Sequence, residues 1–458
     1  MSVSNIIQQQ LGLEPLAKAK HLVVAYSGGV DSHVLLHVLH SLKVSEGYDF
    51  ELSAIHIHHG LSENADTWQQ HCQQVCQQLN IPFQTANLVL ELKPRQSLEA
   101  LARDMRYQKL QELAPVYSQV LLGQHQDDQL ETFLLQLKRG AGPKGLSGMS
   151  RAWSVKTDAT QYKQLSYYRP LLDVSRQDIL AYAQLHHLKW VEDESNQDVQ
   201  FERNFLRQRV LPVMQERWPT LARTVSRSAS LCAEQQALLE ESCEEKLQGL
   251  RSGENSLDIS GLQLLSQAWM HQVVRYWLNQ QGIQSPSMAV LNRLKPEVFE
   301  AKDDATPILQ WQGWQFRRFD QLLFVIAVPA AKVDFKQRWQ GEKLISLPDD
   351  FGELEFIHVS SAEGIDNYQL RFDPNLGPID IRIGGYSAKF KPQISPHSKP
   401  IKQWFKQWKI PPWKRDKAII LSQNDSVLSV FCDNQWRHAE QQLESSDITL
   451  VKHTIPDY

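Results

Sequence analysis

The chain contains 458 residues, of which 42% are hydrophobic and 22% charged, so it is long enough for two or three domains and excludes no globular fold class. Its formal net charge of −4 argues, as an average, against a nucleic-acid partner. No stretch approaches the ~20 apolar residues of a membrane span, and no signal-peptide pattern opens the sequence. We therefore expect a cytoplasmic protein with no membrane partner.

Apolar runs typical of strands alternate with helical patterns along the first ~220 residues, which predicts an α/β domain whose parallel sheet has helices on both faces. The predicted strands are 22–25, 52–57, 83–89 and 119–122. The predicted helices are 33–43, 65–79, 97–113 and 128–138. Ligands of such sheets bind at the carboxyl ends of the strands, so we expect the functional motifs directly after strands.

A glycine turn follows the first predicted strand and leads into a helix; its residues are Ser27, Gly28, Gly29, Val30, Asp31 and Ser32. Glycines let the backbone approach an anion, and the unpaired N–H groups of a first helical turn bind phosphate. No Lys follows as in a Walker A loop, and Asp31 is placed for Mg²⁺, which favours chemistry at an α-phosphate. The alternative is a plain turn with a helix N-cap.

This S-G-G-x-D-S motif resembles the PP-loop of the ATP-pyrophosphatase superfamily, which implies that residues 27–32 bind ATP. The second predicted strand ends in His56-Ile57-His58-His59-Gly60, and strand alternation points His56 and His59 to opposite faces, which disfavours zinc. In the resembled superfamily this strand end lies beside the adenine, which implies a nucleotide contact at His56. A hydrogen-bonded histidine at a strand end is the alternative.

The fourth predicted strand is followed by a run of charged residues that opens a helix. His125 and Asp128 are spaced to meet on one helix face, as are Asp127 and Glu131. Acidic residues in a first helical turn often only complement the helix dipole. Two adjacent Asp residues with a His and a Glu exceed that need and suit metal binding, with Asp127 joining Asp31 at Mg²⁺, and the recognition and deprotonation of an amine.

The run His-x-Asp-Asp-Gln-x-Glu-Thr, followed by 138–149, is similar to a signature of the tRNA(Ile)-lysidine synthase family. So are residues 190–198 and 203–212, and with the PP-loop these motifs cover about the first 215 residues in the family's order. Many relatives carry a second His where this chain has Gln124. We therefore assign any histidine role to His125.

The resemblance implies an enzyme that uses ATP to adenylate the C2 oxygen of the wobble cytidine in a precursor isoleucine tRNA. The ε-amine of free L-lysine then displaces AMP, which forms lysidine and changes the codon read from Met to Ile. A carboxylate must hold the ammonium and a base must deprotonate it, for which Asp128 and Glu131 are candidates. The catalytic set implied is Asp31, His125, Asp128, Glu131, Arg203 and Arg207.

Four arginines are candidates for binding phosphate. Arg103 and Arg106 lie on the predicted helix before the fourth strand, and Arg203 and Arg207 lie one helical turn apart. A guanidinium group can grip phosphate and offset charge in a transition state. A solvated helix face is the alternative. The glycine-rich stretch 140–148 is either a loop or a lid over the site.

The composition changes beyond the first domain, and we expect domains at 1–217, 218–345 and 350–458. Helices are predicted at 220–248 and 269–278, and strands at 310–318 and 322–328, so the middle domain is mainly helical and resembles the family's tRNA-contacting domain. A linker is predicted near 340–350. The last domain is expected to be small and α+β.

The segment 382–417 has an RNA-binding composition, because it contains ten basic residues and a single acidic residue, Asp416, with aromatic residues between them. Core tryptophans at i, i+4 are the alternative for Trp404 and Trp408. The segment is similar to the family's C-terminal domain, which implies that the tRNA is bound by Lys399, Lys402, Lys406, Lys414 and Arg415.

Three other functions are less compatible with the sequence. A PP-loop tRNA thiolase needs cluster or persulfide cysteines, and no C-x-x-C is present. An amide-forming synthetase of the superfamily carries or recruits a glutaminase, and no nucleophilic Cys lies near the start. A non-catalytic RNA-binding module has no need for the acidic residues. The sequence leaves open the oligomeric state, a homodimer included, the general base, the anticodon-reading residues and the basis of selectivity for lysine.

Overall fold

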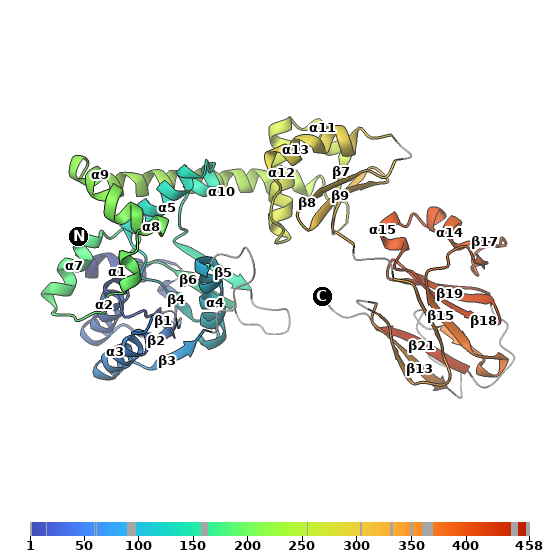
Figure 1. The fold of residues 1–458 in the computed structure, drawn as a ribbon, viewed down its shortest axis with the longest axis horizontal. Coiled ribbons are helices and arrows are strands. Elements are labelled where there is room, and N and C mark those ends of the chain that lie inside the picture. Colours follow the sequence, from blue (N-terminus) through green and yellow to red (C-terminus); the bar gives the residue numbers. More distant parts are fainter. Residues whose placement is uncertain are drawn as a thin grey trace. The chain divides into compact units, whose positions relative to one another are not determined.

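The structure is a computed structural model, and it describes residues 2–454 except 15, 59, 61, 89–97, 157–163, 254, 303–304, 330–332, 349–350, 360–369 and 441–447. Its contacts divide the chain into two compact units, Met1–Ser242 and Cys243–Tyr458 (Figure 1). The division into three domains at 217 and 345–350 stays a prediction. Within the described residues, no helix is long and apolar enough to cross a bilayer.

The first unit alternates strands and helices, as the sequence predicts. Its strands are β1 (His21–Ala25), β2 (Glu51–His58), β3 (Phe83–Asn87), β4 (Gln119–Leu121), β5 (Ala152–Lys156) and β6 (Gln164–Tyr168). Its helices are α1 (Val3–Leu11), α2 (Val30–Glu46), α3 (Ala65–Gln78), α4 (Leu98–Leu113), α5 (Gln126–Lys138), α6 (Pro143–Leu146), α7 (Arg176–Leu185), α8 (Glu202–Phe205) and α9 (Leu211–Arg217), with α10 (Leu221–Gln248) crossing into the second unit.

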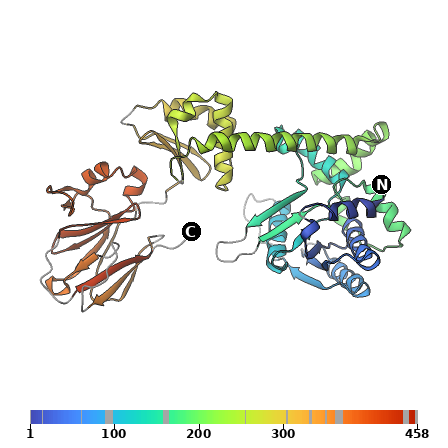
Figure 2. The same cartoon turned by 180° about the vertical axis from the view of Figure 1, so that it is seen from behind.

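The described strands of this unit form one sheet in the order β3-β2-β1-β4-β6-β5, with β5 antiparallel to β6 and the other pairs parallel. Successive residues of β1 pack into different cores, because Leu22 and Val24 lie among α1, α2 and α7, whereas Val23 lies with Leu110 of α4. Helices therefore cover both faces (Figures 1 and 2). This confirms the predicted parallel-sheet class.

The sequence analysis missed β5 and β6. Both are only five residues long, so their alternation of apolar and polar residues extends over few positions. Pairing of β6 with β4 places the residue that follows Tyr168 at the same sheet edge as Gly123 and the start of α5. The end predicted for the third strand, Val89, lies outside the described residues.

The described residues of the second unit form four further sheets, one of them two-stranded, together with helices. Its helices are α11 (Ile259–Leu264), α12 (Gln267–Gln280), α13 (Met288–Leu294), α14 (Ile401–Gln407) and α15 (Pro412–Arg415). One sheet, β7-β10-β9-β8, consists of β7 (Ser256–Asp258), β8 (Ile308–Trp311), β9 (Trp314–Phe319) and β10 (Leu322–Ala327).

The strands after residue 330 belong to two larger sheets, β11-β15-β18-β19-β20 and β12-β13-β21-β14, and a two-stranded pair, β16-β17. Their bounds are β11 (Phe335–Arg338), β12 (Leu344–Ser346), β13 (Glu353–Val359), β14 (Leu370–Phe372), β15 (Ile379–Ile383), β16 (Lys389–Phe390), β17 (Lys399–Pro400), β18 (Ile419–Gln423), β19 (Ser426–Cys432), β20 (Gln435–His438) and β21 (Ile448–Thr454).

Two predictions for this unit are wrong. The strand predicted at 310–318 is a hairpin, because Gln312 adopts φ 46° and the chain turns at Gly313 between β8 and β9. The linker predicted near 340–350 contains β12, which pairs with β13, and Trp339 before it is buried in a core with Ile345. Residues 335–346 thus pack with the last domain.

Candidate active site

The turn after β1 has the geometry of an anion-binding loop. Gly28 has φ +86°, and a Cβ added to it would lie 2.8 Å from Val191 Cγ2 and 2.9 Å from Cys72 Sγ, so only glycine fits. Gly29 is the N-cap of α2 and provides no side-chain cap. The backbone N–H groups that open α2 are therefore available to an anion.

Two serines brace this turn from within. Ser32 Oγ accepts from Ser27 N–H at 3.2 Å, lies 3.0 Å from Ser27 Oγ and donates to Gly29 O at 3.1 Å. After β4, a Cβ on Gly123 would lie 3.1 Å from Ser32 N, so the end of β4 packs directly against the start of α2. This contact brings the two motifs of the sequence together.

His125 is the N-cap of α5 and is almost completely buried. The ring Nδ1 of His125 accepts a hydrogen bond from the backbone N–H of Asp127 at 3.2 Å. The backbone N–H of His125 donates to Asp128 Oδ2 at 3.0 Å, and the two bonds make a capping box. Because Nδ1 is an acceptor, the proton of the neutral ring lies on Nε2. His125 is therefore a fixed donor at Nε2 rather than a free base.

The Nε2 atom of His125 points between two carboxylates. It lies 3.6 Å from Asp31 Oδ1 and 3.5 Å from Asp128 Oδ2. Neither His125 Nε2 nor Asp31 Oδ1 has a hydrogen-bond partner among the described atoms, although both are buried. Burial raises the pKa of Asp31, and the charge of Asp128 adds to the shift while His125 opposes it.

Arg207 joins the same cluster from η3 (Leu206–Val210), a π-helical turn after α8. Its Nε and Nη2 donate to the two oxygens of Glu131 at 2.7 and 3.0 Å, and Nη2 also donates to Asp128 Oδ1 at 3.2 Å. Burial alone would lower the pKa of Arg207, but the bonds to Glu131 outweigh it and raise the pKa. The guanidinium fork is occupied by carboxylates, which differs from the predicted phosphate grip.

Asp127 is turned away from this cluster. Its Oδ2 accepts from Arg176 N–H at 2.8 Å at the start of α7, and its Oδ1 accepts from Gln215 Nε2 at 3.1 Å. Both oxygens thus have one protein partner each, and the Mg²⁺ role of Asp127 stays a prediction. The unpartnered Oδ1 of Asp31 does fit a cation.

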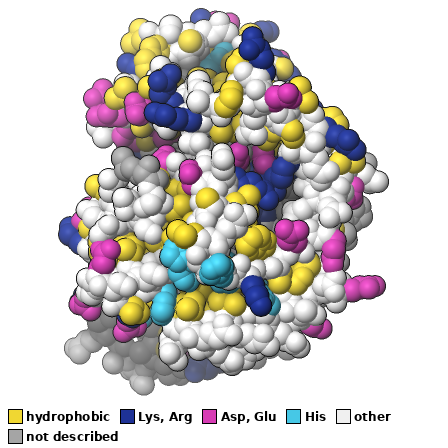
Figure 3. Space-filling model, turned by 90° about the vertical axis from the view of Figure 1, so that its left-hand side faces the viewer, with side chains coloured by type: hydrophobic (Ala, Val, Ile, Leu, Met, Phe, Trp, Pro, Cys, Tyr) yellow, Lys and Arg dark blue, Asp and Glu magenta, His cyan; other side chains and the backbone are white. Residues whose placement is uncertain are grey.

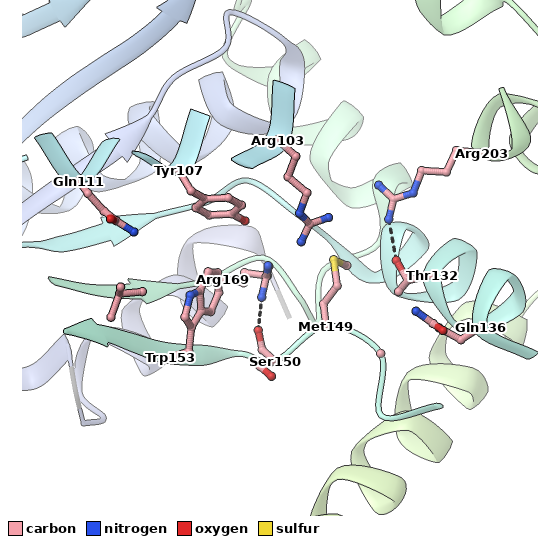
Figure 4. A pocket seen from close by; sticks show the side chains of 12 residues that line it. Arg103, Tyr107, Gln111, Thr132, Gln136, Met149, Ser150, Trp153, Arg169 and Arg203 are labelled. Atoms are coloured by element: carbon pink, nitrogen blue, oxygen red, sulfur yellow. Dashed lines mark hydrogen bonds between the residues drawn. The ribbon is translucent and has the colours of Figure 1, made fainter. Parts of the chain in front are cut away.

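The remaining arginine candidates separate from Arg207. Arg203 donates from Nη2 to Thr132 Oγ1 at 2.7 Å and lines a pocket of about 560 Å³ together with Arg103 (Figure 4). Arg106 is half-buried beside these two, and burial and their charges lower its pKa. In the fold, Arg203 and Arg207 contact successive residues of α5, Thr132 and Glu131.

The predicted lid is anchored at its far end. Gln129, buried on α5, accepts from Met149 N–H at 2.7 Å and donates to Met149 O at 3.3 Å. Within the glycine-rich stretch 140–148, α6 forms a short helix. The stretch is therefore partly helical, and the residue after it is held to α5 by Gln129.

The other histidines make structural contacts. His56 is buried and its Nδ1 donates to Tyr26 O at 2.9 Å, as in the alternative of a hydrogen-bonded histidine at a strand end. A nucleotide contact at His56 stays a prediction. His37 Nδ1 lies 3.0 Å from the Tyr182 hydroxyl. Histidine side chains gather on one face of the molecule (Figure 3), but no group of His, Cys, Asp and Glu suited to a metal ion occurs in the part of the chain that the structure describes.

Comparisons with known proteins identify the family. A PP-loop domain model matches residues 2–214, a TilS substrate binding domain model matches 257–324, and a TilS substrate C-terminal domain model matches 379–446. The tRNA(Ile)-lysidine synthase of Edwardsiella ictaluri is 40% identical, over 91% of each chain. The chain belongs to the tRNA(Ile)-lysidine synthase family. The synthases of Serratia proteamaculans and Vibrio cholerae are 40% and 38% identical over 93% and 95% of this chain and cover 94% and 96% of their own.

The basic residues predicted to bind tRNA divide into two groups in this lysidine synthase family member. Lys402 and Lys406 are exposed one turn apart on α14 and have no ion pair with a described residue. Lys399 lies 5.0 Å from the Trp404 ring, Lys414 pairs with Asp433 at 2.6 Å, and Arg415 Nε donates to Ile410 O at 2.8 Å. These three residues form the second group, whose members contact other side chains or the backbone of the protein.

The interleaved aromatics of this segment are mainly core. Trp404 and Phe405 are each 1% exposed, and Trp404 Nε1 donates to Phe390 O at 2.8 Å. Trp408 stacks on Trp404 with ring centroids 5.7 Å apart. The i, i+4 alternative is therefore correct, and Trp404 offers no face on which a base could stack.

Sequence reasoning missed Arg169, which follows β6 and is 3% exposed. Its Nε donates to Gln124 Oε1 at 3.0 Å and its Nη1 to Ser150 O. Gln124, the position at which many family members carry His, thus supports an arginine. The signal was a basic residue directly after a strand, and it was lost because β6 was not predicted.

Proposed function

We propose that this protein is an ATP-dependent ligase that converts the wobble cytidine of a precursor isoleucine tRNA into lysidine. The observation that supports it most is the position of His125 Nε2 between Asp31 and Asp128, beside the uncapped start of α2. This juxtaposition places an anion-binding loop, a fixed donor and carboxylates at one sheet edge. An adenylation followed by an amine transfer needs all three.

The first step joins the nucleotide and the tRNA. The C2 oxygen of cytidine attacks the α-phosphorus of ATP, a P–O bond forms, and the bond to the β-phosphate oxygen breaks to release pyrophosphate. In this step the backbone of residues 27–32 holds the leaving pyrophosphate, and the unpartnered Nε2–H of His125 donates to a phosphate oxygen. Mg²⁺, which Asp31 would hold, supplies charge neutralisation at the phosphates when bound.

The second step forms the carbon–nitrogen bond. The ε-ammonium group of lysine first gives a proton to a base. The free amine then attacks C2, and the C2–O bond breaks so that AMP leaves with that oxygen. Asp128 and Glu131 contact the single guanidinium group of Arg207, and Asp31 lies in the same cluster, 3.6 Å from His125 Nε2. Three carboxylates with one guanidinium group favour an incoming ammonium group. Asp128 and Glu131 thus share Arg207 as a partner and would bind the ammonium group together with it.

The second unit contributes tRNA affinity in this proposal. Lys402 and Lys406 are the cations best placed to meet a phosphate backbone, because both are exposed and neither has a described ion pair. The enzyme acts in the cytoplasm, where ATP, free lysine and the tRNA are present, as a monomer or a homodimer.

The test is to incubate the protein with ATP, Mg²⁺, labelled lysine and precursor isoleucine tRNA, and to search for a lysine–cytidine adduct by nucleoside mass spectrometry. The proposal expects one AMP and one pyrophosphate per adduct. A tRNA whose wobble cytidine is replaced by uridine is the matched control and should give no adduct. Pyrophosphate release without transfer of labelled lysine would reject the amine step.

A further inference from the structure

A pocket on the first unit lies next to the acidic cluster and has an unusual lining. Its described residues include Arg103, Arg169 and Arg203, with no Asp or Glu among them. Figure 4 shows the three guanidinium groups directed toward a common space around Met149. A pocket with three cations and no counter-charge in its lining attracts an anionic ligand.

The hydrogen bonds of these arginines go to neutral oxygens. Arg169 donates to the Gln124 carboxamide and the Ser150 carbonyl, and Arg203 donates to the Thr132 hydroxyl. Arg169 is also 3% exposed, so its charge is desolvated without a hydrogen-bonded carboxylate. An anion in the pocket would compensate this charge.

Aromatic rings form the other wall. Trp153 stacks on Tyr167 with ring centroids 4.9 Å apart and planes 10° apart, and Tyr107 packs edge-on to Trp153 at 6.0 Å. The Arg169 guanidinium lies 4.3 Å from the Trp153 ring centre. The stack behind Trp153 fixes its ring, and Trp153 itself is only half-buried. Rigid aromatic faces beside arginines are typical of sites for unstacked bases.

The pocket adjoins the acidic cluster along α5. Glu131 faces Arg207, and the next residue, Thr132, faces Arg203 in the pocket. A lysine molecule carries an extra positive charge at neutral pH and is repelled by three arginines, whereas the carboxylates around Arg207 attract it. The two adjoining regions along α5 thus suit substrate groups of opposite charge.

We propose that this pocket receives a pyrimidine nucleotide extruded from an RNA loop, with its base against Trp153 and Tyr107 and its flanking phosphates on Arg103 and Arg203. The inference rests on the proposed function, for which it names the entry site of the wobble cytidine. The volume of about 560 Å³ is within the usual range for small-molecule sites. Gln136 on α5 also lines the pocket and offers amide groups to a base edge.

The experiment uses the full chain and an anticodon stem-loop with pyrrolocytidine, a fluorescent cytidine analogue, at the wobble position. Stacking in the pocket should quench the fluorescence on binding to the unaltered protein. Trp153→Leu should abolish the quench and raise KM for tRNA by about tenfold, while Trp153→Phe should restore both. Arg103→Gln should raise KM for tRNA by a similar factor and leave KM for lysine unchanged.

Trp218→Leu and Arg217→Gln are the matched controls, because both residues are exposed in the same unit and lie outside the pocket lining. They should retain the quench and KM. A rise in KM for lysine with KM for tRNA unchanged would overturn the inference and assign the pocket to the lysine carboxylate. An unaltered quench in Trp153→Leu would also overturn it, even if the unaltered protein forms lysidine. If that protein formed no lysidine, the proposed function itself would fail.

Discussion

Replacing Glu131 with Gln tests whether the buried contact between Glu131 and Arg207 is an ion pair. Glu131 is 1% exposed and accepts two hydrogen bonds from Arg207, at 2.7 and 3.0 Å. Gln keeps one acceptor and turns an NH₂ group toward the guanidinium, so one bond to Arg207 is lost. The half-buried Arg207 then keeps Asp128, at 3.2 Å, as its charged hydrogen-bond partner. We expect the N-terminal unit to lose about 2–4 kcal/mol.

The assay is hydrogen exchange of peptides that cover α5 in the full chain, because local opening energies do not require two-state unfolding of both units. A double-mutant cycle with Arg207→Gln should return a coupling of about 2–3 kcal/mol. Glu297→Gln, in an exposed bidentate pair with Arg293 at 2.6 and 2.9 Å, is the matched control and should leave exchange of its own helix unchanged.

The outcome also decides the protonation state. Burial raises the pKa of Glu131, and its bonds with Arg207 oppose that shift. A protonated Glu131 would have nearly the same shape and charge as Gln. A loss below about 1 kcal/mol at neutral pH, with no coupling to Arg207, would therefore refute the ion pair and leave Arg207 free for a phosphate.

Three further predictions concern both units. Asp31→Asn should abolish tRNA adenylation with tRNA affinity nearly unchanged. Because burial raises the pKa of Asp31, ionisation of this residue lowers the stability of the fold as pH rises. The free energy of unfolding of the variant should therefore be higher at about pH 7, by on the order of 1 kcal/mol, and equal to that of the unaltered protein near pH 4. Weakened tRNA binding with normal adenylation would contradict the assignment. Lys402→Glu with Lys406→Glu should weaken tRNA binding and reduce the slope of log affinity against log salt by about 1.4 or more, and an unchanged slope would count against this surface. Trp404→Ala should destabilise its domain by about 3–5 kcal/mol, measured by urea unfolding, and a selective loss of tRNA binding in a fully stable variant would return Trp404 to the RNA-binding set.

Short motifs with their flanking patterns were sufficient to predict the catalytic half of the fold. The glycine turn, the helix after it and four strands follow from local signals, because turn geometry and helix capping depend on residues within one or two turns of each other. The same applies to His125 with Asp128, whose contact closes a capping box three residues long. The short length of β5 and β6 hid them, and β6 is the strand that places Arg169.

The amino-acid sequence by itself determined that a phosphate loop, an acidic helix start and a late basic segment exist in this protein, since each is a local pattern of residue types. Only the tertiary structure decided which of those residues act together. Arg207 meets Glu131 across 76 positions, Asp127 is used by the start of α7, and Trp404 is withdrawn into a core. Such pairings depend on which elements pack side by side, and burial selects among partners that are equivalent in sequence.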